Sequence, residues 1–209
     1  MYFKVLTMDS DKYRKDIEDI KNLMNRSSTF LSLSGFSGVL AGVYALVGAY
    51  VANQILQGAG SYQQGPEQEI FRDIAITAAA VLLLSLITAG VLTYLKAEKA
   101  GENIWNTTSR RMLINFLIPL VTGGAFALLL LRTESYSLIA AVMLIFYGLS
   151  CVNASKYTLH DVRYLGLTVI VLGLVATALP QHALLLWALG FGICHIIYGS
   201  IMYFKYDRG

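Results

Sequence analysis

The chain alternates between long apolar runs and short polar segments. An α-helix needs about 20 apolar residues to cross a hydrocarbon layer of about 30 Å, because each residue adds about 1.5 Å. Six runs are close to that length, so the pattern predicts an all-α, polytopic membrane bundle of six transmembrane helices. We place them at Phe30–Leu56, Ile74–Leu95, Met112–Leu131, Ser135–Val152, Val162–Leu179 and Ala183–Phe204.

The connections between these helices predict how they pair. Very short connections near Thr133 and Gln181 make the third and fourth helices one antiparallel hairpin, and the fifth and sixth another. A longer, glycine-containing external loop over residues 57–72 is predicted to join the first two helices. Three hairpins are therefore the simplest architecture.

The segment before the first helix has a different pattern. Residues 9–28 predict an amphipathic helix, because Tyr13, Ile17, Ile20 and Met24 fall on one stripe. Its charges nearly cancel, which favours docking on a protein over lying on anionic lipid, with a solvated extension of the first helix as the alternative. We therefore divide the chain into a cytoplasmic segment, 1–28, and a six-helix transmembrane domain, 29–209.

The basic residues predict the orientation. All of the 16 lysines and arginines except Arg72 and Arg132 fall in the amino-terminal segment, the second and fourth loops, or the carboxyl-terminal tail. Loops rich in lysine and arginine are retained in the cytoplasm during insertion. Both chain ends are therefore predicted to be cytoplasmic, with the bundle in a bacterial inner membrane.

Composition agrees with this interpretation and excludes one class of partner. Hydrophobic residues make up 56% of the chain and charged residues only 14%, whereas soluble domains have about 25% charged residues. The net charge of +3 is explained by topology, because no basic patch is interleaved with aromatic residues. The expected partner is the lipid bilayer and not nucleic acid.

Charged residues are absent from the predicted helix cores, which argues against a proton pump, a voltage sensor or a carboxylate active site. His195 is the one ionisable residue near the middle of a run. It is either functional or a neutral imidazole that shares a hydrogen bond with a neighbouring Tyr or Ser. The helices contain no second central histidine that could pair with His195 to bind haem. The sequence also lacks the residue spacings that are typical of zinc ligands. We therefore expect no catalytic residues, no metal and no cofactor.

Pro119 lies inside the third predicted helix. It has no N–H to donate to the carbonyl of Asn115, so a kink or a local opening is expected there. Gly123 and Gly124 should loosen the next turn. Broken helices are where membrane proteins place binding sites, although proline kinks also occur in helices that bind no ligand.

Several polar residues are predicted to lie at the midplane or in the cytoplasmic half of the bilayer. They form either a cavity lining or hydrogen bonds between helices, which are worth about 0.6 to 2 kcal/mol each in membranes. The candidate ligand-binding residues are His195, Tyr198, Tyr147, Asn115, Tyr44 and Asn153.

Small residues in the first helix are predicted to be packing positions. Gly38 and Gly42 lie on one stripe with four-residue spacing, and Ala45 lies on a second. Such stripes let helix backbones approach closely. They serve either packing inside the bundle or a homo-oligomer interface.

The first helix also resembles a known type of protein. Residues 26–46, RSSTFLSLSGFSGVLAGVYAL, resemble the first-helix region of a family of small bacterial six-helix integral membrane proteins to which no activity is assigned. The resemblance implies a fold but no functional residues.

Two functions are compatible with these features. The first is binding or passing a small neutral or lipophilic solute through a cytoplasm-facing cavity. The alternative is a non-catalytic sensor or scaffold whose amino-terminal helix engages a cytoplasmic protein. An intramembrane enzyme has least support, because neither a carboxylate pair nor a nucleophile with a base is visible.

Overall fold

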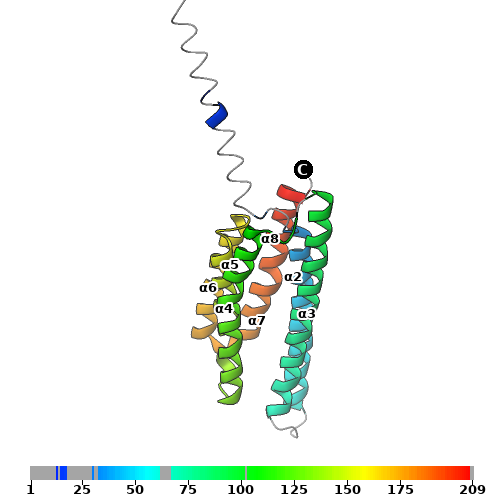
Figure 1. Cartoon of the computed structure of the whole chain (residues 1–209). Helices are drawn as coiled ribbons and strands as arrows, with labels where there is room; N and C mark the ends of the chain where they lie inside the picture. Colours follow the sequence, from blue (N-terminus) through cyan, green and yellow to red (C-terminus); the bar gives the residue numbers. More distant parts are fainter. Residues whose placement is uncertain are drawn as a thin grey trace, which may run out of the picture.

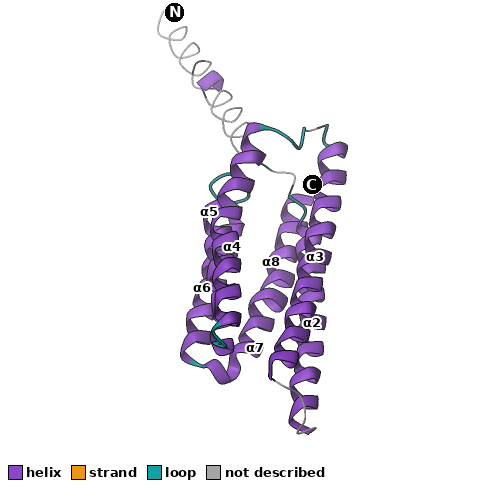
Figure 2. Cartoon of the chain, turned by 60° about the horizontal axis from the view of Figure 1, so that its bottom comes forward, coloured by secondary structure: helices purple, strands orange, loops and turns teal. Residues whose placement is uncertain are grey.

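A computed structural model describes residues 13, 15–17, 30, 33–61, 67–101 and 103–207, without the side chains of 59–68. Within these residues every regular element is a helix (Figure 2). The elements of the bundle are α2 (Gly35–Ser61), α3 (Glu67–Lys99), α4 (Thr107–Arg132), η1 (Tyr136–Leu138), α5 (Ile139–Ala154), α6 (Asp161–Ala178), η2 (Pro180–His182), α7 (Ala183–Trp187), η3 (Ala188–Ile193), α8 (Cys194–Met202) and η4 (Tyr203–Asp207).

Six helical segments among the described residues are long and apolar enough to cross a membrane. The last of them, Pro180–Asp207, is a continuous column that runs from η2 to η4. Many large apolar side chains face outward, among them Leu82, Leu83 and Leu84 on α3. A surface of this kind suits lipid as the solvent and would be unfavourable in water. The predicted six-helix membrane bundle is confirmed.

The helices form two groups with a column between them (Figure 1). On one side α5 packs against both α4 and α6, and on the other α3 packs against α2. The column of α7, η3 and α8 lies between the groups in both views and packs mainly on α2, with further contacts to α5 and α6. The sixth transmembrane segment therefore joins the two halves of the bundle.

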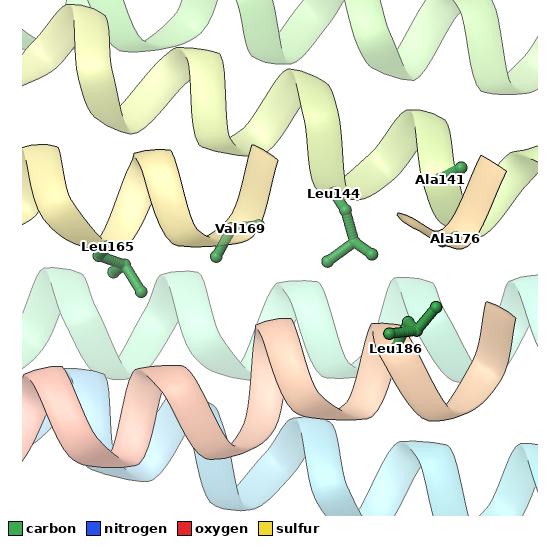
Figure 3. Packing of buried hydrophobic residues seen from close by; sticks show 6 residues of the cluster. All are labelled: Ala141, Leu144, Leu165, Val169, Ala176 and Leu186. Atoms are coloured by element: carbon green, nitrogen blue, oxygen red, sulfur yellow. The ribbon is translucent and has the colours of Figure 1, made fainter. Parts of the chain in front are cut away.

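The most buried apolar cluster lies where α5, α6 and α7 meet (Figure 3). Leu144 of α5 and Val169 of α6 have no exposed surface, and Leu186 of α7 belongs to the same cluster. Because lipid is as apolar as these side chains, close packing rather than removal from water stabilises the contact.

Small residues bring α2 close to the sixth segment. A Cβ atom on Gly42 would lie 2.6 Å from the carbonyl oxygen of Gly192, and one on Gly38 would lie 3.2 Å from the Cα of Gly199. Ala45 is 1% exposed and packs in the cluster of Trp187. The structure thus places these three small residues of α2 inside the bundle, against the column.

The predicted loop over residues 57–72 is wrong for most of its length. Helix α2 continues to Ser61 and α3 begins at Glu67, so residues 57–61 and 67–72 are helical, and residues 62–66 lie outside the described residues. Glutamine, glutamate and arginine in this stretch are good helix formers. Adding residues to an existing helix is also easier than starting a new one.

The first helix begins five residues later than predicted, at Gly35. The backbone N–H of Phe30 donates to the carbonyl of Tyr157 at 2.8 Å, and the hydroxyl of Thr158 donates to the carbonyl of Phe30 at 2.9 Å. These bonds hold the chain before α2 against the α5–α6 connection, which explains why Phe30 is outside the helix.

Little of the amino-terminal segment belongs to the described residues. Tyr13 and Ile17 are in helical conformation and are exposed. Apart from residues 13 and 15–17, the predicted helix over 9–28, including Ile20 and Met24, lies outside the described residues. Its docking on a cytoplasmic protein stays a prediction, as does the division of the chain at residue 28.

Ion pairs join the helices at one end of the bundle, which we call the termini end because α2 begins and η4 ends there. The carboxylate of Asp207 accepts from the Lys96 Nζ of α3 at 2.7 Å and from the Gly35 N–H at 2.9 Å. The carboxylate of Asp161, which begins α6, accepts from Lys205 Nζ at 2.9 Å. Element η4 therefore ties α2, α3 and α6 together.

Candidate functional site

His195 is buried, with 7% of its surface exposed, and both of its ring nitrogens have partners. Nδ1 lies 2.9 Å from the carbonyl oxygen of Gly190, and Nε2 lies 2.7 Å from the hydroxyl oxygen of Tyr147. A carbonyl oxygen can only accept, so Nδ1 carries a hydrogen. A buried charge is costly unless an opposite charge pairs with it, and both partners of this ring are uncharged, so Nε2 is unprotonated and accepts from the tyrosine. The imidazole is therefore neutral and fully satisfied.

A π-helical turn positions this histidine. In η3 each backbone hydrogen bond joins residues that are five apart in the sequence. The N–H of Cys194, for example, donates to the carbonyl of Leu189. His195 follows Gly190 by the same five residues, and its ring reaches back to that carbonyl. Wide turns of this kind are rare and are often found at functional sites. Apart from Gly190 and Gly192 within it, no local pattern indicates this turn.

Tyr147 links α5 to the sixth segment. Its ring lies 5.0 Å from that of Phe191 and packs edge-on against Phe116 at 6.0 Å. Cys151, one turn further along α5, is buried. Among the described residues no buried polar side-chain atom lacks a partner. The group thus connects α5 to the sixth segment, and each of its polar side-chain atoms has a hydrogen-bond partner.

Replacing Tyr147 by phenylalanine is expected to lower stability by about 1 to 2 kcal/mol, because His195 Nε2 would be left buried without a donor. The measurement is thermal unfolding of the full chain in one detergent. Tyr164→Phe, at an exposed position on α6, should stay within about 0.5 kcal/mol of the parent chain. Equal melting temperatures for both variants would contradict the role assigned to this hydrogen bond.

A second polar contact lies beside Pro119. This residue cannot donate to the carbonyl of Asn115, and the side chain of Asn153 from α5 donates to that oxygen instead, at 3.0 Å. Helix α4 continues through the proline from Thr107 to Arg132. The carbonyl freed by the proline is therefore bound by the neighbouring helix.

Next to this contact is a hollow of about 260 Å³ between α4 and α5. Its lining residues are Pro119, Leu149, Val152, Asn153 and Lys156. Leu149 is 40% exposed, so the hollow opens to the outside of the bundle.

The hollow and the buried histidine are separate features. Leu149 follows Tyr147 by two residues, which places it about 200° further around α5. Tyr147 faces the sixth segment, where it bonds to His195, whereas Leu149 faces the hollow. A ligand in the hollow would not reach the imidazole.

The six candidate ligand-binding residues do not share one lining in the described structure. Asn153 lines the hollow, and Asn115 is bonded to it. The hydroxyl of Tyr44 lies 3.4 Å from that of Thr88, between α2 and α3. Tyr198 packs against the apolar cluster of Figure 3. The structure thus brings together two pairs, Asn115 with Asn153 and Tyr147 with His195.

The two glycines that follow Pro119 have different surroundings. A Cβ atom on Gly123 would lie 2.3 Å from the Cβ of Phe146, whereas one on Gly124 would meet nothing within 4 Å. Of these two glycines, Gly123 is therefore the one at which α5 packs closely against α4. The predicted loosening of this turn stays a prediction.

Sequence reasoning missed Leu149, Val152 and Lys156 as members of a site. Their positions relative to Leu149 are i, i+3 and i+7, which share one helix face, with Asn153 at i+4. This spacing, together with a proline on the preceding helix, is a pattern from which a site between the two helices could have been predicted.

Among the described residues, no three His, Cys, Asp or Glu side chains gather closely enough to hold a metal ion. No family model matches the chain, and no curated protein or solved structure matches it. The resemblance of residues 26–46 to small bacterial membrane proteins stays a prediction. The hollow between α4 and α5 is therefore the candidate site, on the strength of its geometry.

Proposed function

We propose that the chain is an inner-membrane protein, with both ends in the cytoplasm, that binds a small lipophilic molecule in the hollow between α4 and α5. The observation that carries this proposal is the hollow itself, with its lining of three apolar and two polar residues. The orientation is supported by the distribution of lysine and arginine, which are concentrated at the termini end.

The size and opening of the hollow indicate what it can hold. Sites for small molecules usually have volumes of about 300 to 1,000 Å³. A volume of about 260 Å³ therefore suits part of a molecule, such as a segment of an alkyl chain. Since the exposed Leu149 faces outward, such a ligand would enter sideways from the membrane.

The depth of the hollow favours one leaflet for the proposed ligand. Helix α5 runs toward the termini end, and Asn153 lies about 6 Å nearer to that end than Leu149. Lys156 follows in the turn after α5. With the termini end in the cytoplasm, the apolar part of the hollow lies in the cytoplasmic leaflet and its polar edge lies at the interface.

The experiment is photolabelling of the full chain in nanodiscs with a fatty acid that carries a diazirine on its alkyl chain. Leu149→Trp should fill the hollow and reduce labelling of α4 and α5 to the background found on α3. Leu167→Trp, at a similarly exposed position on α6, is the matched control and should leave labelling unchanged. Both variants must first show the melting temperature of the parent chain.

Undiminished labelling of α4 and α5 in Leu149→Trp would rule out the hollow as the binding site.

A further inference from the structure

Lys156, at the edge of the hollow, forms no ion pair with a carboxylate of the described residues. Its Nζ donates to the side-chain oxygen of Asn153, at 3.3 Å. In the described part of the chain the ion pairs are Arg72–Asp73, Lys96–Asp207 and Lys205–Asp161. An ammonium group has three N–H donors, so Lys156 keeps two of them, and its full charge, for a ligand.

The other polar groups at this edge are largely committed. The amide of Asn153 donates to the carbonyl of Asn115 and accepts from Lys156. The hydroxyl of Ser155 donates to the carbonyl of Val152 at 2.7 Å. The edge thus offers positive charge rather than the several amide and hydroxyl groups that would bind a neutral sugar or alcohol.

Further basic residues lie at the same end of the bundle as Lys156. They are Arg110 and Arg111 on α4 and Arg163 on α6, and all three are exposed. The carboxylate of Asp161, at the start of α6, is already held by Lys205 and Tyr206. Clusters of lysine and arginine at a membrane surface attract anionic lipid headgroups.

The direction of the hollow matches that of a membrane lipid. Its charged edge lies at the end of α5, and its apolar part lies deeper, at Leu149 and Pro119. A phospholipid has the same order, with the phosphate at the interface and the acyl chain inside. The carbonyl end of α5 carries a partial negative charge, so an anion at this position depends on Lys156.

From these observations we infer that the hollow binds an anionic phospholipid of the surrounding membrane, with its phosphate at Lys156 and an acyl chain against Pro119, Leu149 and Val152. The inference rests on the proposed function and names the class of its ligand.

The test is native mass spectrometry of the full chain, released from micelles that contain equal amounts of phosphatidylglycerol and phosphatidylcholine. The parent chain should retain phosphatidylglycerol preferentially. Lys156→Gln should reduce that preference about fivefold, the effect of one basic residue near a membrane surface. Lys156→Arg should preserve it, and so should Lys99→Gln, which removes an exposed lysine from the end of α3.

Three outcomes would overturn the inference. An unchanged lipid preference in Lys156→Gln would show that the lysine does not select the lipid. Loss of bound phosphatidylglycerol on addition of inorganic phosphate would show that phosphate alone is the ligand. Equal retention of both lipids by the parent chain would show that binding does not depend on charge.

The Leu149→Trp variant separates this inference from the proposed function. If it loses both lipids while Lys156→Gln keeps its preference, the hollow is still the binding site and only the placement of the phosphate at Lys156 is wrong. If it retains both lipids as the parent chain does, the hollow is not the binding site and both proposals fail.

Discussion

Replacing Gly199 by alanine is expected to destabilise the bundle by about 3 kcal/mol, at the upper end of the usual cost of overpacking. The added Cβ would lie 2.6 Å from the backbone nitrogen of Val39 and 2.8 Å from the carbonyl oxygen of Gly35. Both atoms belong to the backbone around the start of α2, which cannot rotate away as a side chain can. The methyl group can be accommodated only if α2 and α8 move apart.

Gly90→Ala is the matched control, because a Cβ at this position on α3 would meet nothing within 4 Å. Alanine is a better helix former than glycine by about 1 kcal/mol, so this variant should be as stable as the parent chain or slightly more so. The measurement is thermal unfolding of the full chain in one detergent. If Gly199→Ala melts at the same temperature as Gly90→Ala, the close contact between α2 and α8 is not present.

Replacing Asp207 by asparagine is expected to lower stability by about 2 kcal/mol. The side chains of Lys96 and Asp207 are 25% and 10% exposed, so their ion pair is largely shielded from water. Removing one charge from a buried pair costs about 3 to 5 kcal/mol, and exposed pairs are worth about 0 to 1 kcal/mol. The single side-chain oxygen of asparagine can still accept from the Gly35 N–H, but its amide nitrogen cannot accept from Lys96, so the change removes the charge together with the bond to Lys96.

Asp73→Asn makes the same substitution in an exposed pair, where Arg72 and Asp73 are 62% and 50% exposed. Its effect should stay below about 0.5 kcal/mol. Adding 1 M salt should reduce the difference between the two variants only slightly, because salt screens buried pairs weakly. Similar melting temperatures for both variants would mean that η4 does not hold the termini end together.

The number of membrane helices could be predicted from the sequence because bilayer thickness fixes the length of each apolar run. The ends of the helices could not, since polar residues outside the bilayer can extend a helix that has already formed. Residues 57–61 and 67–72 show this, because their composition predicted a loop and they are helical. The place of the sixth segment beside α2 depends on contacts such as Gly42 with Gly192, which no local pattern encodes.

The candidate site was predicted in part. Pro119 indicated an unpaired carbonyl at Asn115, which follows from covalent structure alone. That Asn153 would donate to this carbonyl could not be derived, because it depends on the register between α4 and α5. For His195 the sequence left two interpretations open, and hydrogen bonds to Tyr147 and Gly190 are visible only in three dimensions.

The most direct test of the lipid-binding hollow is a density map of the full chain purified in native lipid. We expect an elongated density between α4 and α5 that passes Leu149 and Pro119 and ends at the Nζ of Lys156. A map that resolves lipid elsewhere around the bundle, but shows this hollow free of lipid, would contradict the account.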